Sequence, residues 1–155
     1  MTMRIYIPAL FLALAAGAQT HPNFSGTWKQ DDSRSTVRPG STLKYSNKIE
    51  HHDPKLSKTT ILDYGDRAPT PYTQTYTTDG KPVKSSDREG DEFTTTVKWE
   101  GDTLVFETGE KEKTGALFTR ETWTLSADGT TLTKKIHRTG GRGGDSDQTY
   151  VLVKQ

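Results

Sequence analysis

Apolar and polar side chains alternate along most of this chain, with the period of two that a half-buried β-strand produces. Leu43, Tyr45 and Ile49, for example, are separated by charged or small polar residues. The same alternation recurs in further short runs, at residues 26–30, 56–64, 72–76, 93–99, 104–106, 117–125, 132–138 and 149–154. No stretch between the runs has the periodicity of a helix. The pattern predicts about nine strands, to within one or two.

Residues typical of tight turns separate these runs. Glu100-Gly101-Asp102 and Ala127-Asp128-Gly129-Thr130 predict hairpins, because glycine adopts a positive φ without a Cβ clash. The glycine-rich run Gly140-Gly141-Arg142-Gly143-Gly144 is expected to form another hairpin tip. The longest loops, 65–71 and 79–91, are short enough to stay local. Short strands joined in sequence order predict an all-β fold, a single antiparallel up-and-down barrel of about 8 to 10 strands. The alternative, an open sandwich, usually needs longer crossovers.

The first 18 residues have the three parts of an export signal. Arg4 makes the start positive, residues 5–16 form an apolar run, and Ala16-Gly17-Ala18 offers the small-x-small pattern of a cleavage site. The run is shorter than the roughly 17 to 25 residues that span a bilayer. We therefore expect a signal peptide at 1–18, cleaved after Ala18, and one domain at 19–155. The protein is then exported, periplasmic or secreted, with no membrane insertion after cleavage.

Composition narrows the classes of partner. Removing Arg4 with the signal leaves 20 basic and 20 acidic residues, and a net charge of zero does not favour nucleic acid or an anionic membrane surface. The chain has no cysteine, so disulfides and thiolate metal sites are excluded. Hydrophobic residues make up 30% of the sequence, which predicts a thin core on one face of the strands.

Three phrases resemble those of exported bacterial lipocalin-like proteins of the calycin superfamily. They are Gly26-Thr27-Trp28 within residues 23–29, the hairpin at residues 99–105 and the hairpin at residues 126–133. The Thr-Asp-Tyr phrase of lipocalins themselves is missing, so the resemblance is to lipocalin-like proteins. It implies that Trp28 packs across the closed end of a barrel, with a basic side chain, Arg138 or Lys154, over its indole. A cation in that position contributes about 0.5 to 2 kcal/mol.

The residue types of a metal site occur together at His51, His52 and Asp53. Alternation places His51 and Asp53 on one face of the strand and His52 on the other, so at most two ligands converge locally. We therefore expect solvated residues at a strand end, with no metal and no cofactor.

Glu121 shares a strand face with Leu117, Trp123 and Leu125, which predicts that its carboxylate points into the barrel. A buried carboxylate needs a partner, and Lys134 or Arg138 on the next strand can supply one. Two interpretations stay open. Glu121 is either a polar anchor for a ligand or one half of a structural ion pair.

Aromatic side chains at alternating positions are expected to crowd the interior: Trp28, Trp99, Trp123, Tyr45, Tyr64, Tyr72, Tyr76 and Tyr150. Such residues ordinarily form core. Together with a few polar groups they also match the usual lining of a small-molecule site. The predicted ligand-binding residues are Trp28, Tyr45, Asn47, Gln74, Tyr76, Trp99, Glu121, Trp123 and Arg138.

These observations favour an exported lipocalin-like protein that binds a small, partly apolar or amphipathic molecule without catalysis. The alternative is an envelope protein-binding or inhibitor module that acts through its loops, such as residues 79–91. A third interpretation is an enzyme with Glu121 or His51 as acid or base, which requires a perturbed titrating group in an open cleft.

Overall fold

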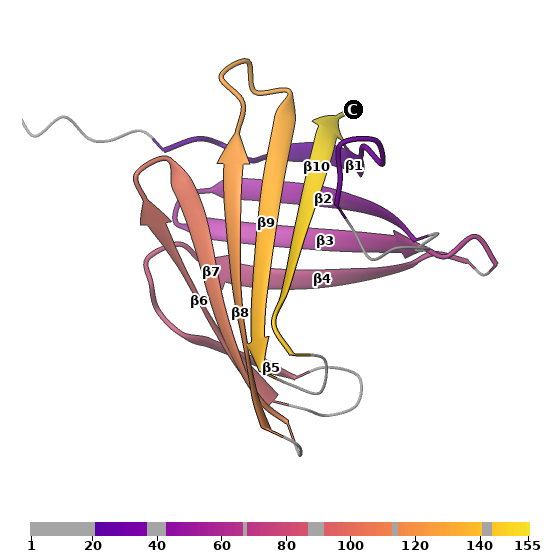
Figure 1. Cartoon of the computed structure of the whole chain (residues 1–155). Coiled ribbons are helices and arrows are strands. Elements are labelled where there is room, and N and C mark those ends of the chain that lie inside the picture. Colours follow the sequence, from indigo (N-terminus) through magenta and orange to yellow (C-terminus); the bar gives the residue numbers. More distant parts are fainter. Residues whose placement is uncertain (1–20, 37–42, 67, 87–91, 113–114, 141–143) are drawn as a thin grey trace, which may run out of the picture.

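The computed structural model describes residues 21–36, 43–66, 68–86, 92–112, 115–140 and 144–155. These residues form ten β-strands that curve into a nearly closed barrel (Figure 1). In this part of the chain no helix is long and apolar enough to cross a membrane. The strands are β1 (Gly26–Gln30), β2 (Lys44–His52), β3 (Lys55–Asp63), β4 (Thr70–Thr77), β5 (Val83–Ser86), β6 (Glu92–Glu100), β7 (Thr103–Glu112), β8 (Gly115–Leu125), β9 (Thr131–Gly140) and β10 (Ser146–Lys154).

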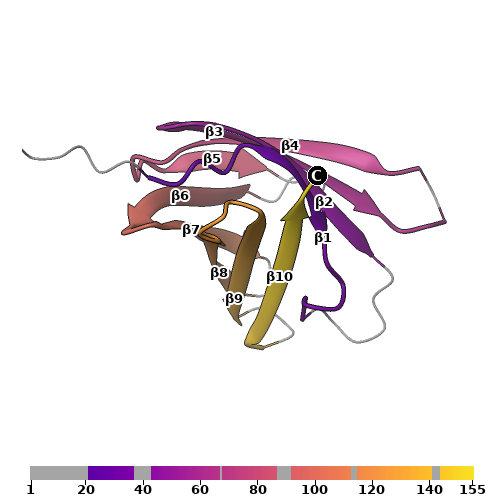
Figure 2. The ribbon, with the colours of Figure 1, turned by 90° about the horizontal axis from the view of Figure 1, so that it is seen from above.

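The strands form one antiparallel sheet in the order β4-β3-β2-β1-β10-β9-β8-β7-β6-β5. Neighbours in the sheet are neighbours in sequence, except that β1 pairs with β10. Seen from the side and from above, β1–β4 run across the direction of β6–β9, so that the curved sheet encloses a single interior (Figures 1 and 2). This arrangement confirms the predicted antiparallel barrel and excludes the open sandwich.

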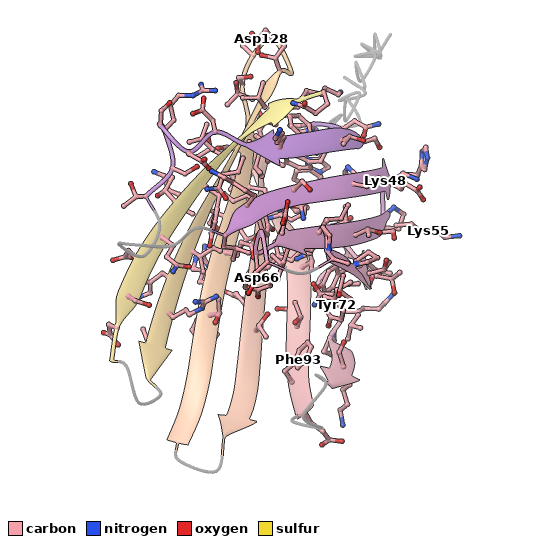
Figure 3. All side chains as sticks on the ribbon, turned by 90° about the vertical axis from the view of Figure 1, so that its right-hand side faces the viewer. Lys48, Lys55, Asp66, Tyr72, Phe93 and Asp128 are labelled. Carbon is pink, nitrogen blue, oxygen red and sulfur yellow. The ribbon has the colours of Figure 1, made fainter. Side chains whose placement is uncertain are left out.

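The wall of the barrel is incomplete between β4 and β5, the two edge strands of the sheet. In the described residues no ladder joins these strands, and β4 lies beside β6 instead. Just after β4, the backbone N–H of Gly80 donates to the carbonyl of Val97 at 2.9 Å. Figure 3 views this side of the barrel and labels Tyr72 on β4 and Phe93 on β6.

The predicted strand runs are confirmed, and ten strands fall within the predicted range, but one strand lies where a loop was expected. β5 lies inside residues 79–91, which the sequence predicts to be a loop, and it pairs with β6 from Val83↔Thr95 to Ser86↔Glu92. Its sequence, Val-Lys-Ser-Ser, has a single apolar residue and therefore no alternation to detect. The expected signal peptide at 1–18 and the centre of the predicted hairpin tip, 141–143, lie outside the described residues.

One end of the barrel is closed by Trp28 and the segment that precedes it. Phe24 and Trp28 are fully buried, and the indole N–H of Trp28 donates to the carbonyl of Phe24 at 2.9 Å. The Lys154 ammonium lies 5.4 Å from the centre of the Trp28 ring, which confirms one of the two expected partners. Arg138, the other, is not there, because it pairs with Thr119 and Ser146 at the opposite end of β9.

Gly26 is required at the start of β1 for two reasons. Its φ is +145°, and a Cβ added there would lie 2.8 Å from Cε of Lys154. Gly26→Ala is therefore expected to lower the free energy of unfolding by about 1 to 2 kcal/mol. Gly109→Ala is the control, because Gly109 has no neighbour within 4 Å of an added Cβ and should tolerate it. Urea unfolding of both variants checks this, and equal midpoints would contradict it.

Candidate functional site

On β2, β3 and β9, side chains that face the interior become more exposed with distance from the closed end. On β9, Leu132 and Lys134 are fully buried, whereas Ile136 and Arg138, on the same face, are half-buried. Half-buried side chains on inward-facing positions mean that solvent reaches the interior from this end. We call this region the accessible half. Its inward-facing, half-buried residues are Tyr45, Leu62, Gln74, Phe93, Thr119, Ile136, Arg138 and Tyr150.

A set of polar side chains lies where the filled half of the interior meets the accessible half. It is built from β2, β3, β8 and β9, and we call it the polar floor. Its members are Tyr45, Asn47, Lys58, Thr60, Glu121 and Lys134. Buried polar groups at the boundary between a packed core and a solvated space are the pattern expected of a ligand site.

Lys134 is the centre of the polar floor. Its side chain is fully buried, and its Nζ donates hydrogen bonds to Oδ1 of Asn47 and, at 3.3 Å, to the hydroxyl of Tyr45. The Nζ also lies 4.0 Å from the centre of the Trp123 ring. Burial lowers the pKa of Lys134 well below its ordinary value, the Glu121 carboxylate opposes this shift, and the Lys58 ammonium adds to it.

Glu121 is the carboxylate of the polar floor, with 17% of its side chain exposed. It accepts a hydrogen bond from the indole N–H of Trp123 and lies 4.0 Å from Nζ of Lys134. Burial raises the pKa of Glu121, but Lys58, Lys134 and the Trp123 N–H together bring it below its ordinary value. Glu121 is therefore ionised at neutral pH, and it faces more positive than negative charge.

Lys58 is a member of this cluster that sequence reasoning did not select. Only 8% of it is exposed, and its Nζ lies 5.9 Å from the centres of both the Tyr76 and Trp123 rings. The alternation does place Lys58 inward, between Leu56 and Thr60. Lysine is rarely buried, so its residue type argues against an inward position. The period of two along the strand predicts the inward position correctly.

The structure gathers several of the predicted ligand-binding residues and separates others. Tyr45, Asn47, Glu121 and Trp123 meet in or under the polar floor, and the charge of Arg138 acts on Glu121. Gln74 is half-buried and pairs in register with Lys58, and Tyr76 is buried against Phe106.

Trp28 and Trp99 lie at the closed end, away from the accessible half. Tyr64 and Tyr72, expected inside, are 42% and 39% exposed. Tyr64 lies just after β3, and Tyr72 lies on the edge strand β4, where the wall is incomplete.

His51 is not a solvated strand-end residue, contrary to the expectation from sequence. It is 3% exposed, because the segment before β1 covers it, and its Nδ1 accepts a hydrogen bond from the N–H of Phe24 at 3.4 Å. Its Nε2 lies 3.6 Å from Oδ1 of Asp53, and the Asp53 carboxylate also accepts from the indole of Trp99 at 3.0 Å. Burial lowers the pKa of His51, and Asp53 opposes this.

The contacts of His51 hold the N-terminal segment across the barrel end, which is a structural task. Ser25 adds to them, since its hydroxyl accepts from the N–H of His51 and donates to the carbonyl of the same residue. Across the described residues, no group of three or more His, Cys, Asp or Glu side chains is placed to hold a metal ion. The polar floor is therefore the stronger candidate site.

No protein-family model and no curated protein sequence matches this chain. Solved structures do. Caenorhabditis elegans lipid binding protein 8 has a TM-score of 0.63 at 13% identity, covering 85% of this chain and 95% of its own. Secretory abundant heat soluble protein 4 from Ramazzottius varieornatus has a TM-score of 0.62 at 13% identity, covering 89% and 99%. A structure described as "REP1-NXSQ fatty acid transporter" has a TM-score of 0.59 at 12% identity, covering 85% and 96%. Likeness at this level of identity shows the fold, and the fold is that of the calycin-like barrels.

Proposed function

We propose that this chain binds a small, partly apolar molecule in the accessible half of the barrel and does not chemically process it as an enzyme. The observation that carries the proposal is the gradient of burial along the inward faces. Residues such as Leu62, Phe93 and Ile136 point inward yet remain partly exposed. A barrel filled by its own side chains would bury them.

The polar floor supports a ligand with a polar end. Tyr45, Glu121 and Arg138 are half-buried, and Lys134, which donates to the hydroxyl of Tyr45, is fully buried. A ligand whose apolar part contacts Leu62, Phe93 and Ile136 can thus place a polar group against these side chains. The names of the similar structures, a lipid binding protein and a fatty acid transporter, agree with such a ligand.

Export to the periplasm or the exterior belongs to the same proposal and rests on the sequence of residues 1–18. The loop-based alternative, a protein-binding or inhibitor module, is less favoured. It predicts an interior filled by side chains, and the partial exposure of Ile136 and Phe93 does not fit that prediction.

A bulky residue in the accessible half should displace the ligand. Thr119 faces inward on β8 and is half-buried, so an indole at this position would occupy the proposed site. We expect Thr119→Trp to weaken binding of 1-anilinonaphthalene-8-sulfonate at least about tenfold, equivalent to about 1.4 kcal/mol. Fluorescence titration of wild type and variant measures the change.

Thr124→Trp is the matched control for this titration. Thr124 lies on the same strand, but it faces outward and is exposed. The control should bind the probe as the wild type does, with one probe per chain. Equal binding by wild type, Thr119→Trp and Thr124→Trp would place the probe on the outer surface and would argue against the proposed function.

A further inference from the structure

We propose that Lys134 is a nucleophilic amine, and that it captures aldehyde- or ketone-bearing apolar ligands as a Schiff base inside the barrel. The inference rests on the proposed function, since the carbonyl compound must enter through the accessible half. It adds a ligand class and a covalent step that noncovalent binding alone does not require.

The hydrogen bonds of Lys134 suit a neutral amine. A neutral amine has two N–H bonds, and Nζ has two acceptors in the structure, Oδ1 of Asn47 and the hydroxyl of Tyr45. The Glu121 carboxylate is 4.0 Å away, too far for a hydrogen bond, and the indole N–H of Trp123 occupies one of its oxygens. A charged ammonium would have a third N–H bond with no oxygen acceptor among these neighbours, so the hydrogen bonding matches the neutral amine.

The surroundings of Lys134 also favour loss of its proton. The side chain is fully buried, and a second buried ammonium, Lys58, faces the same ring of Trp123. Desolvation and a neighbouring cation are the two conditions that activate lysine as a nucleophile in proteins. The low pKa of Lys134 agrees with this geometry.

Lys134 lies one layer below the accessible half. Tyr45, whose hydroxyl is 3.3 Å from Nζ, is half-buried. Its ring lies 4.9 Å from that of Tyr150, at a tilt of 32°, and Tyr150 is half-buried as well. The next inward residue on β9, Ile136, is also half-buried. A carbonyl group at the inner end of a ligand would therefore meet Nζ after a side-chain rotation of Tyr45.

The reaction conserves atoms and charge without another reactant. The Nζ lone pair forms a bond to the carbonyl carbon, and the C=O π electrons move to oxygen, which takes a proton from the Tyr45 hydroxyl. Tyr45 recovers a proton from the nitrogen. The C–O bond then breaks, and the oxygen leaves as water with the second N–H proton, so amine and carbonyl give imine and water. Glu121 is the counter-ion if the imine is protonated.

Labelling with decanal and sodium cyanoborohydride tests the inference, because the hydride traps an imine as a stable secondary amine. The full chain is labelled at neutral pH, and peptide mass spectrometry locates the adducts. We expect the adduct on Lys134 to form at least about tenfold faster than on any exposed lysine, because only the neutral amine attacks a carbonyl. Lys134→Met should lose this fast adduct. Lys135→Met should keep it, since Lys135 is exposed on the outer face of the same strand.

Decanol separates the failure of this inference from failure of the proposed function, since it matches decanal in length but forms no imine. If decanol displaces 1-anilinonaphthalene-8-sulfonate while Lys134 of the wild type stays unlabelled, the covalent step is wrong and noncovalent binding stands. If neither compound displaces the probe and Lys134 is unlabelled, both proposals fail. The positions of the adducts on the wild-type protein decide between these outcomes even if Lys134→Met does not fold.

Discussion

Trp28→Ala is expected to lower the free energy of unfolding by about 3 to 5 kcal/mol, the range for truncating a large buried aromatic residue. Trp28 is fully buried at the closed end, and its N–H donates to the carbonyl of Phe24. Alanine would leave a cavity, an unpaired carbonyl and a lysine, Lys154, without its aromatic partner. Guanidinium chloride unfolding, followed by circular dichroism, measures the loss.

Phe118→Ala is the control for Trp28→Ala. Phe118 is also aromatic, but it lies on the outer face of β8 with 42% of its surface exposed, so its removal leaves no cavity. A loss below about 1 kcal/mol is expected, as for surface substitutions away from structural features. If the two variants lost equal stability, Trp28 would not be the residue that closes this barrel.

Glu121→Gln should cost about 3 kcal/mol near neutral pH, the low end for breaking a buried ion pair. The change is nearly isosteric, but it leaves Lys58 and Lys134 buried without a carboxylate. The cost stays at the low end because a neutral Lys134 loses no ion pair when the carboxylate is removed. Urea unfolding as a function of pH measures it, and Glu50→Gln, at an exposed position, should show no measurable change.

The pH dependence of this cost has a defined sign. The folded pKa of Glu121 lies below its ordinary value of 4.5, so the stability contributed by the carboxylate is present above pH 4.5 and is lost as pH falls through the folded pKa. The difference between wild type and variant should therefore shrink as pH falls below 4.5. A difference that does not change with pH would show that Glu121 acts through packing alone.

The alternation of the sequence predicted the strands and the inward side of each. Side chains along a strand alternate between its two faces, so one buried residue fixes which of the others on that strand face inward. It placed Tyr45, Asn47, Glu121 and Trp123 inside correctly. It missed β5, since four residues with one apolar side chain carry no pattern, and β5 forms by pairing with β6.

Burial along each strand could not be predicted, because it depends on contacts distant in sequence. His51 is buried only because Phe24 and its neighbours cross the barrel end, 27 residues away in the chain. Tyr72 alternates like a core residue but lies beside the incomplete wall. The alternation also could not predict which half of the interior is filled and which half is open to solvent.

Native mass spectrometry tests the claim that the accessible half is a ligand site most directly. Wild type and Thr119→Trp are purified without detergent and incubated with the same mixture of medium-chain alcohols, acids and aldehydes. A one-to-one adduct on the wild type, absent from Thr119→Trp, is the predicted result. An adduct that Thr119→Trp retains in full, or no adduct on the wild type from any of these compounds, would contradict the account.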